Sequence, residues 1–221
     1  MRDVLLVAAK DLRIERRSRI GTAQVLPFAL LVLLLFAFAL DPDRGLLEAA
    51  TPGLFWVTVL FSAVLALQRN FGIEAEDGII DALRLCGMAP SSIYFGKVLA
   101  LVVQLFALEF VLVIAVAVFY NREFNGIPLL VVISLAATLG IAATGSIYGA
   151  LSARLRSRDT LLPLLMLPLL APVLISATRG SEIALRGEVG TGWSWAALLG
   201  LFASTYLIVG AVLFSPLLED A

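Results

Sequence analysis

An all-α membrane protein with several spans is the fold that this sequence predicts, and three observations support it. Of the 221 residues, 61% are hydrophobic, whereas soluble domains average about 45–50%. The excess lies in long uninterrupted apolar runs, each of a length that crosses a bilayer as a helix. The segments between these runs are short and polar. We therefore expect one transmembrane domain over residues 1–221, with six membrane-spanning helices preceded by an amphipathic helix.

The N-terminal segment, residues 1–19, is expected to form an interfacial helix on the cytoplasmic face of the membrane. Its basic side chains suit anionic lipid headgroups, and its apolar face suits the acyl boundary. The basic residues that we assign to this interface are Arg13, Arg16 and Arg17. A helical projection groups the apolar residues Leu5, Ala8, Ala9 and Leu12.

Six apolar runs follow, and each is expected to be one span. Their bounds are residues 23–40, 52–67, 93–120, 127–151, 160–178 and 193–214. The first run reaches roughly 27 Å as a helix, just enough to cross the bilayer. Trp56 is expected to be an interface anchor at the outer end of the second span. In the fourth span, Gly145 and Gly149 form a GxxxG motif, which we expect to serve packing within the chain.

The fifth span contains Pro163, Pro168 and Pro172. Proline removes a helical hydrogen bond. The span is therefore either a kinked or discontinuous helix that hinges, as in transporters, or a helix whose kink only shapes packing.

The distribution of Lys and Arg predicts the orientation. Most of them lie in the N-terminal segment, in residues 69–90 and in residues 152–159, and basic connections remain on the cytoplasmic side. Both termini are therefore expected in the cytoplasm. Lys97 would then lie near the cytoplasmic end of the third span, and we expect its ammonium group to reach the headgroups.

Residues 69–90 are the longest polar interruption and carry four acids, which is unusual on the basic side of a membrane protein. As a helix, Glu74, Asp77 and Asp81 share one face, and Leu83 belongs to a neighbouring apolar stripe. An acidic amphipathic helix in the cytoplasm suits docking of a partner with a basic surface. The alternative is a solvated loop.

Two polar residues, Gln104 and Glu109, lie deep in the third span. They are five residues apart and therefore point to different sides of a helix. An acid at this depth costs about 2.5–3.5 kcal/mol on insertion scales. Glu109 is either part of a polar substrate path or subunit interface, or a protonated or hydrogen-bonded packing residue.

Several chemistries are excluded by composition. The sequence has no histidine and a single cysteine, which excludes histidine bases, histidine-ligated metal or haem, and an internal disulfide. A phosphate-binding loop motif is absent, and the net charge of −1 gives no basis for nucleic-acid binding. We expect a chain that is not itself an enzyme and binds neither metal nor another cofactor directly.

One set of residues, taken with its spacing, resembles the pattern of a known protein family. It consists of Phe71, Glu74, Asp77, Gly78, Leu83, Pro90, Ile93, Gly96 and Lys97. Together with residues 10–15 and 26–28, this pattern resembles the haem exporter protein B family (CcmB), the membrane subunit of a bacterial ABC transporter in cytochrome c maturation. Length, span number and N-terminal helix are also similar, and the resemblance implies an ABC-2-type exporter-like fold in the bacterial cytoplasmic (inner) membrane.

The resemblance also implies partners. These are a CcmA-like ATPase that binds ATP and magnesium, a second copy of this chain, and CcmC-like, CcmD-like and CcmE-like proteins. The complex would use ATP hydrolysis to export haem or to release the haem-loaded chaperone, so haem is the cargo of the complex. The expected ATPase-docking residues are Phe71, Glu74, Glu76, Asp77, Gly78, Asp81 and Leu83.

Two other functions remain open at this stage. An ABC-2-type export permease for a lipid or drug would have the same architecture and a different cargo. A membrane scaffold that transports nothing would need no ATPase.

Overall fold

The structure, a computed structural model, is all-helical over the part of the chain that it describes. The described residues are 2–18, 20–40, 44–77, 87–120, 124–152 and 158–219. The helices are α1 (Arg2–Ser18), α2 (Ile20–Ala39), α3 (Arg44–Asp77), α5 (Pro90–Phe119), α6 (Ile127–Ser152), α7 (Arg158–Leu185) and α8 (Val189–Glu219). The predicted fold class, an all-α polytopic membrane protein, is confirmed.

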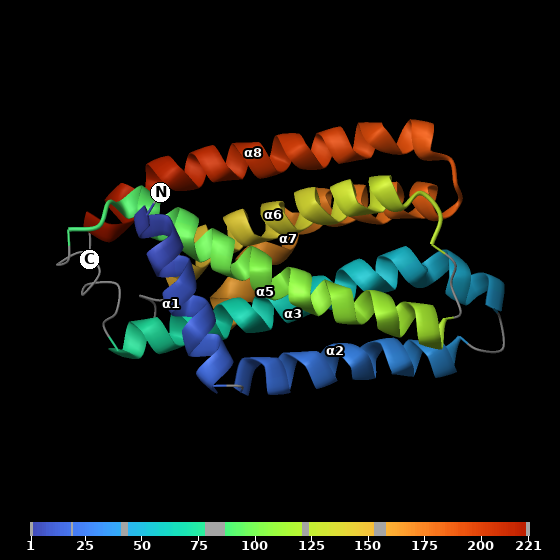
Figure 1. The fold of residues 1–221 in the computed structure, drawn as a ribbon, viewed down its shortest axis with the longest axis horizontal. Helices are drawn as coiled ribbons and strands as arrows, with labels where there is room; N and C mark the ends of the chain where they lie inside the picture. Colours follow the sequence, from blue (N-terminus) through green and yellow to red (C-terminus); the bar gives the residue numbers. More distant parts are fainter. Residues whose placement is uncertain are drawn as a thin grey trace.

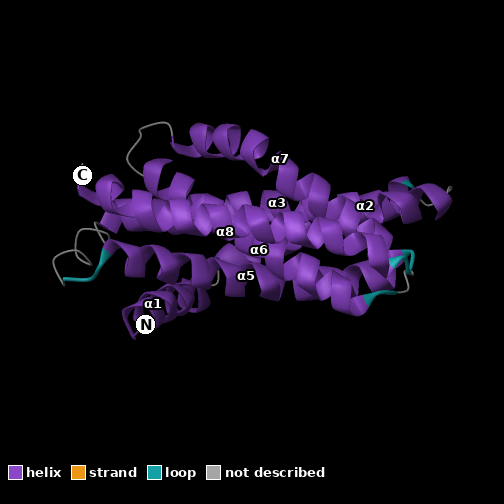
Figure 2. Cartoon of the chain, turned by 90° about the horizontal axis from the view of Figure 1, so that it is seen from above, coloured by secondary structure: helices purple, strands orange, loops and turns teal. Residues whose placement is uncertain are grey.

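The long helices lie side by side along the long axis, and α1 crosses the end of α5 at a steep angle (Figure 1). Helix α6 is central, because it packs against α3, α5, α7 and α8. Helices α1 and α7 lie on opposite sides of the bundle (Figure 2). The N-terminal helix α1 therefore packs against one side of the bundle, near one of its ends.

Within the described residues, four helices are long and apolar enough to cross a membrane. These stretches are Gly45–Phe71, Pro90–Phe119, Ile127–Leu151 and Gly190–Pro216. Helix α2 adds a shorter apolar stretch, Gln24–Ala39. The expected number of six spans stays a prediction.

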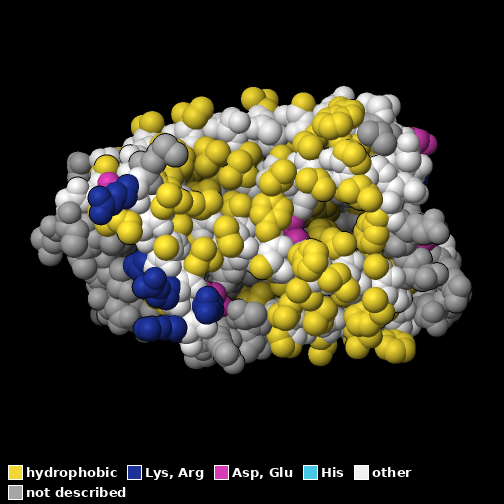
Figure 3. Space-filling model, viewed as in Figure 1, with side chains coloured by type: hydrophobic (Ala, Val, Ile, Leu, Met, Phe, Trp, Pro, Cys, Tyr) yellow, Lys and Arg dark blue, Asp and Glu magenta, His cyan; other side chains and the backbone are white. Residues whose placement is uncertain are grey.

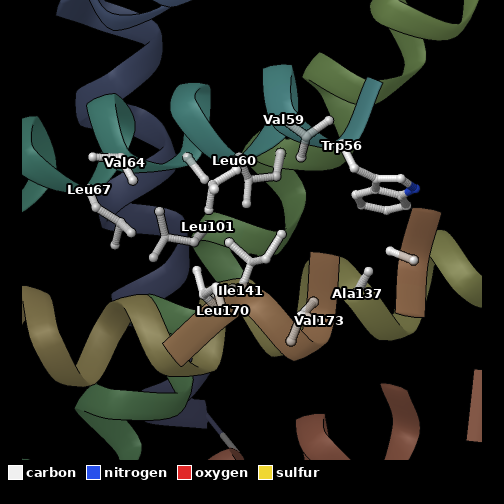
Figure 4. Packing of buried hydrophobic residues seen from close by; sticks show 14 of the residues in the cluster. Trp56, Val59, Leu60, Val64, Leu67, Leu101, Ala137, Ile141, Leu170 and Val173 are labelled. Carbon is white, nitrogen blue, oxygen red and sulfur yellow. The ribbon is translucent and has the colours of Figure 1, made fainter. Parts of the chain in front are cut away.

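The core is made by branched and aromatic side chains from several helices. Figure 4 shows part of it, with Trp56, Leu60 and Leu67 of α3, Leu101 of α5, Ile141 of α6, and Leu170 and Val173 of α7. The face of the molecule in Figure 3 is also largely apolar, as contact with lipid requires. Large exposed apolar side chains of the described residues include Phe38, Phe110, Leu201 and Val212.

Helix α3 extends beyond the expected second span, residues 52–67, at both ends, and the bounds of the span itself stay a prediction. It begins at Arg44 instead of 52, and it continues to Asp77 instead of ending near 67. The polar residues after Leu67 end the apolar run, but they are compatible with a helix, so the helix continues beyond it. The beginning of the 69–90 segment is therefore part of α3 and not a separate element.

Helix α7 is also longer than expected. It runs unbroken from Arg158 to Leu185 in spite of its prolines, which excludes the discontinuous form of this helix. Its polar end is supported by Glu182, which pairs with Arg179 at 3.0 Å and with Arg186 at 2.7 Å. Gly187, with φ of 81°, follows the helix in a conformation that favours glycine.

Two further expectations concern packing. The GxxxG motif of α6 packs within the chain, as predicted, because a Cβ atom at Gly145 would lie 2.4 Å from Leu67 of α3. Trp56 is not an interface anchor. It is 2% exposed, and its Nε1 donates a hydrogen bond of 3.0 Å to Ser181 Oγ of α7.

Candidate functional site

Phe71, in the second-last turn of α3, is the centre of the candidate site. Its side chain is 2% exposed. A Cβ atom at Gly149 of α6 would lie 2.4 Å from two carbons of the Phe71 ring, so only glycine leaves room for the ring. Phe71 was expected on a docking surface, and this is corrected: its side chain is buried and anchors the end of α3.

Lys97 of α5 lies over the Phe71 ring. Its Nζ is 4.8 Å from the ring centroid and 3.9 Å from Asp11 Oδ2 of α1. Lys97 is 3% exposed, so the expectation that it reaches the headgroups is wrong. An ammonium group over an aromatic face and near a carboxylate is stabilised by both. Lys97 therefore joins α5 to α1 and α3.

The approach of α1 to α5 depends on Gly96. A Cβ atom at this glycine would lie 2.6 Å from Val7 Cβ and 3.0 Å from the Val4 carbonyl oxygen. The face of α1 that packs is therefore Val4, Val7 and Asp11, spaced i, i+3 and i+7. The predicted apolar face is only partly correct, since Ala8 is buried but Leu5 is 60% exposed.

The predicted acidic docking residues are only partly within the described structure. Glu74, Glu76 and Asp77 belong to the last turns of α3. Gly78, Asp81 and Leu83 lie outside the described residues. The acidic docking surface stays a prediction, but its first acids follow Phe71 on the same helix.

The other predicted charges and polar groups are dispersed. Arg13, Arg16 and Arg17 are exposed on α1, as a headgroup-facing surface would require. Gln104 of α5 accepts a hydrogen bond of 3.2 Å from Asn70 Nδ2 of α3. The two polar residues of the third span thus serve different neighbours, because Glu109 faces α6.

Glu109 is 3% exposed and accepts hydrogen bonds from the hydroxyl groups of Ser134 and Thr138 of α6. This is the hydrogen-bonded packing arrangement, the second of the two alternatives for Glu109. The sequence analysis missed the two hydroxyl residues, although their i, i+4 spacing on an apolar helix places them on one face.

Replacing Glu109 with leucine is expected to lower stability by about 1–3 kcal/mol, because Ser134 and Thr138 lose their acceptor in a buried place. Glu109→Gln keeps an acceptor oxygen and is expected to cost less. The thermal unfolding midpoint in detergent, measured for both variants, checks this. A leucine variant as stable as the glutamine variant would show that the hydroxyl groups find other acceptors.

An apolar cavity of about 350 Å³ lies beside Ser134, between α3, α5, α6 and α7. Trp56 and Ser181 line it, and most of its other lining is aliphatic or aromatic. Within the described residues, no group of three or more acidic or cysteine side chains could hold a metal ion. The polar contacts beside this cavity join α3 to α7, through Trp56 and Ser181, and α5 to α6, through Glu109 and Ser134.

Comparisons with known proteins agree with the family resemblance of the sequence. The family model described as CcmB protein matches residues 2–218. The chain is 32% identical to heme exporter protein B of Haemophilus influenzae over 213 residues, which are 96% of this chain and 93% of that protein. It is 32% identical to heme exporter protein B of Paracoccus denitrificans, covering 82% of each chain. It is 30% identical to heme exporter protein B of Pseudomonas aeruginosa, covering 90% of each. With a match that runs through both the packed core and the α1–α3–α5 contact, the chain belongs to the CcmB protein family.

Proposed function

We propose that this chain is the membrane subunit of a haem export system for the maturation of c-type cytochromes. The family match over residues 2–218 supports this, as does the name heme exporter protein B, which the curated relatives carry. The match to the first of these relatives covers 96% of this chain and 93% of that protein. The all-helical membrane fold agrees with a permease subunit; that the chain is not itself an enzyme is part of the proposal.

The finer proposal is that a CcmA-like ATPase docks at the acidic end of α3. The observation that carries it is the buried contact between Phe71 and Lys97. This contact ties the helix that bears Glu74 and Asp77 to α5 and, through Asp11, to α1. A displacement of the acidic end of α3 would therefore be transmitted through packed side chains to α5 and α1.

The cycle that we propose begins with ATP and magnesium on the ATPase. Closure of two ATPases moves the ends of α3 in two copies of this chain, and each Phe71–Lys97 contact passes the movement to α5 and α1. The energy serves haem export or release of the haem-loaded CcmE-like chaperone, with CcmC-like and CcmD-like proteins as further partners. The complex lies in the bacterial inner membrane with both termini of this chain in the cytoplasm.

Charge reversal at the acidic end tests the docking. The double variant Glu74→Lys and Asp77→Lys is expected to lose most of the co-purifying ATPase, because two lysines face a basic partner surface. Affinity purification from native membranes, with mass spectrometry and an ATPase assay, measures the loss. Glu188→Lys is the matched control, since Glu188 is exposed in the connection between α7 and α8.

The recovered partners decide the cargo. An ATPase together with CcmC-like and CcmE-like proteins agrees with the cytochrome function. An ATPase without these companions would favour a lipid or drug as cargo. Unchanged ATPase recovery with the double variant, at wild-type expression, would refute docking at this end of α3.

A further inference from the structure

A second cavity, of about 420 Å³, lies between α1, α2, α3 and α5. Its walls are mostly aliphatic, with Val25 and Leu26 from α2 and Val103, Leu108 and Val111 from α5. None of the residues that we place in the ATPase-docking segment lines it. This cavity therefore calls for an explanation separate from the proposed function.

The mouth of the cavity is basic. Arg16 and Leu12 of α1 line it, and both also line an adjoining hollow of about 420 Å³ that Arg13 and Arg17 complete. The three arginines are exposed. Figure 3 shows Lys and Arg side chains gathered at the end of the molecule where α1 lies, beside hydrophobic surface. One acid, Glu15, lines the same mouth, so the charge there remains positive.

The inner wall holds a hydroxyl group that lacks a partner. Ser62 of α3 lines the cavity and is 0% exposed. Among the described residues, its Oγ has no hydrogen-bond partner. A buried hydroxyl without a partner is costly, and native structures rarely keep one. A ligand oxygen in the cavity would give Ser62 an acceptor.

The side of the cavity away from the core opens to the surroundings. Val103 and Ala107 of α5 line it and are exposed. Val103 is 44% exposed, and the aliphatic side chains of Leu108 and Val111 continue the lining along α5. Since this surface faces lipid, a chain of the bilayer can enter the cavity sideways without crossing a polar region.

We propose that this cavity binds one anionic phospholipid. Its phosphate would lie at Arg16, with Arg13 and Arg17 around it, because guanidinium groups match phosphate oxygens in charge and geometry. One acyl chain would occupy the aliphatic part between α2 and α5. An ester oxygen of the glycerol unit would accept the hydrogen bond of Ser62. A basic mouth above an apolar cavity at one end of a helix bundle is the arrangement that recognises an anionic headgroup.

The proposal is tested with the full chain and its co-purifying partners in nanodiscs of phosphatidylcholine. These contain a trace of phosphatidylglycerol with a photoreactive acyl chain, and the labelled peptides are quantified by mass spectrometry. Labelling is expected in α2 and α5 at the cavity walls. Arg16→Gln is expected to reduce it about tenfold, since a charge-assisted hydrogen bond is lost. Ser62→Leu, which fills the inner wall, is expected to reduce it as well.

The matched control is Arg2→Gln, on the same helix and exposed but lining neither hollow; it is expected to label like the wild type. Photoreactive phosphatidylcholine is expected to label the walls far less, and excess glycerol phosphate is expected not to compete. Equal labelling by both lipids, loss of labelling with glycerol phosphate, or unchanged labelling of Arg16→Gln would each overturn the proposal. The thermal unfolding midpoint of each variant is measured, and labelling is compared only among variants that are folded.

Discussion

Lys97→Glu is expected to detach α1 from the bundle and to cost about 3–5 kcal/mol of stability, the range for a buried charge without its partner. The new carboxylate would lie beside the Asp11 carboxylate and over the Phe71 ring, whose face is also negative. The site is 3% exposed, so water cannot screen the repulsion. We expect a much lower thermal unfolding midpoint in detergent and rapid proteolytic release of α1.

Three variants show whether the loss of stability in Lys97→Glu comes from the reversed charge. Lys97→Arg keeps the cation over the ring and is expected to retain most of the stability. Combining Lys97→Glu with Asp11→Lys restores opposite charges and is expected to recover part of it. Arg2→Glu, an exposed reversal on the same helix, is expected to change little. A Lys97→Glu protein with the wild-type midpoint would mean that the ammonium group does not hold α1 in place.

Gly149→Ala is the second change with a large expected effect. The added methyl group would lie 2.4 Å from the Phe71 ring, which is held between α6 and Lys97 and has little room to move. Overpacking of this kind costs about 1–3 kcal/mol. The free energy of unfolding, obtained from denaturant titration in detergent, measures it. Gly200→Ala is the control, because nothing lies within 4 Å of its added atom and alanine favours a helix.

A double-mutant cycle separates this contact from a general effect of alanine. In a Phe71→Ala background the ring is absent, so Gly149→Ala is expected to cost little or to be stabilising. The difference between the two backgrounds is the coupling free energy of the pair. Costs that simply add would show that Gly149 and Phe71 act independently, and the anchoring of α3 would need another explanation.

The sequence predicted the helices well, because apolar runs and polar connections are local properties. It predicted helix ends less well. At the end of α3, the apolar run stops near Leu67 while the helix continues to Asp77. Hydropathy reports the environment that the side chains prefer, whereas a helix ends where the backbone requires it. The same distinction explains why α7 includes Arg179 and Glu182.

The contacts of Lys97 could not be predicted from its depth in a span. Depth along one helix says how far an ammonium group is from the headgroups, but not which helix covers it. The partner, Asp11, lies far away in the sequence, and the sequence analysis assigned it no contact. Its i, i+7 spacing with Val4 and its i, i+4 spacing with Val7 were the available sign that it shares their face. Glu109 was identified as unusual, but its two hydroxyl partners are on another helix.

The place of Phe71 within α3 has a mechanical consequence. The ring holds the helix six residues before its described end at Asp77, a distance of roughly 9 Å along the axis of an α-helix. A beam fixed at one end bends less the shorter its free part is. Glu74 and Asp77 lie three and six residues beyond the buried ring, so a load applied at either would act on α3 close to the point where Phe71 holds it.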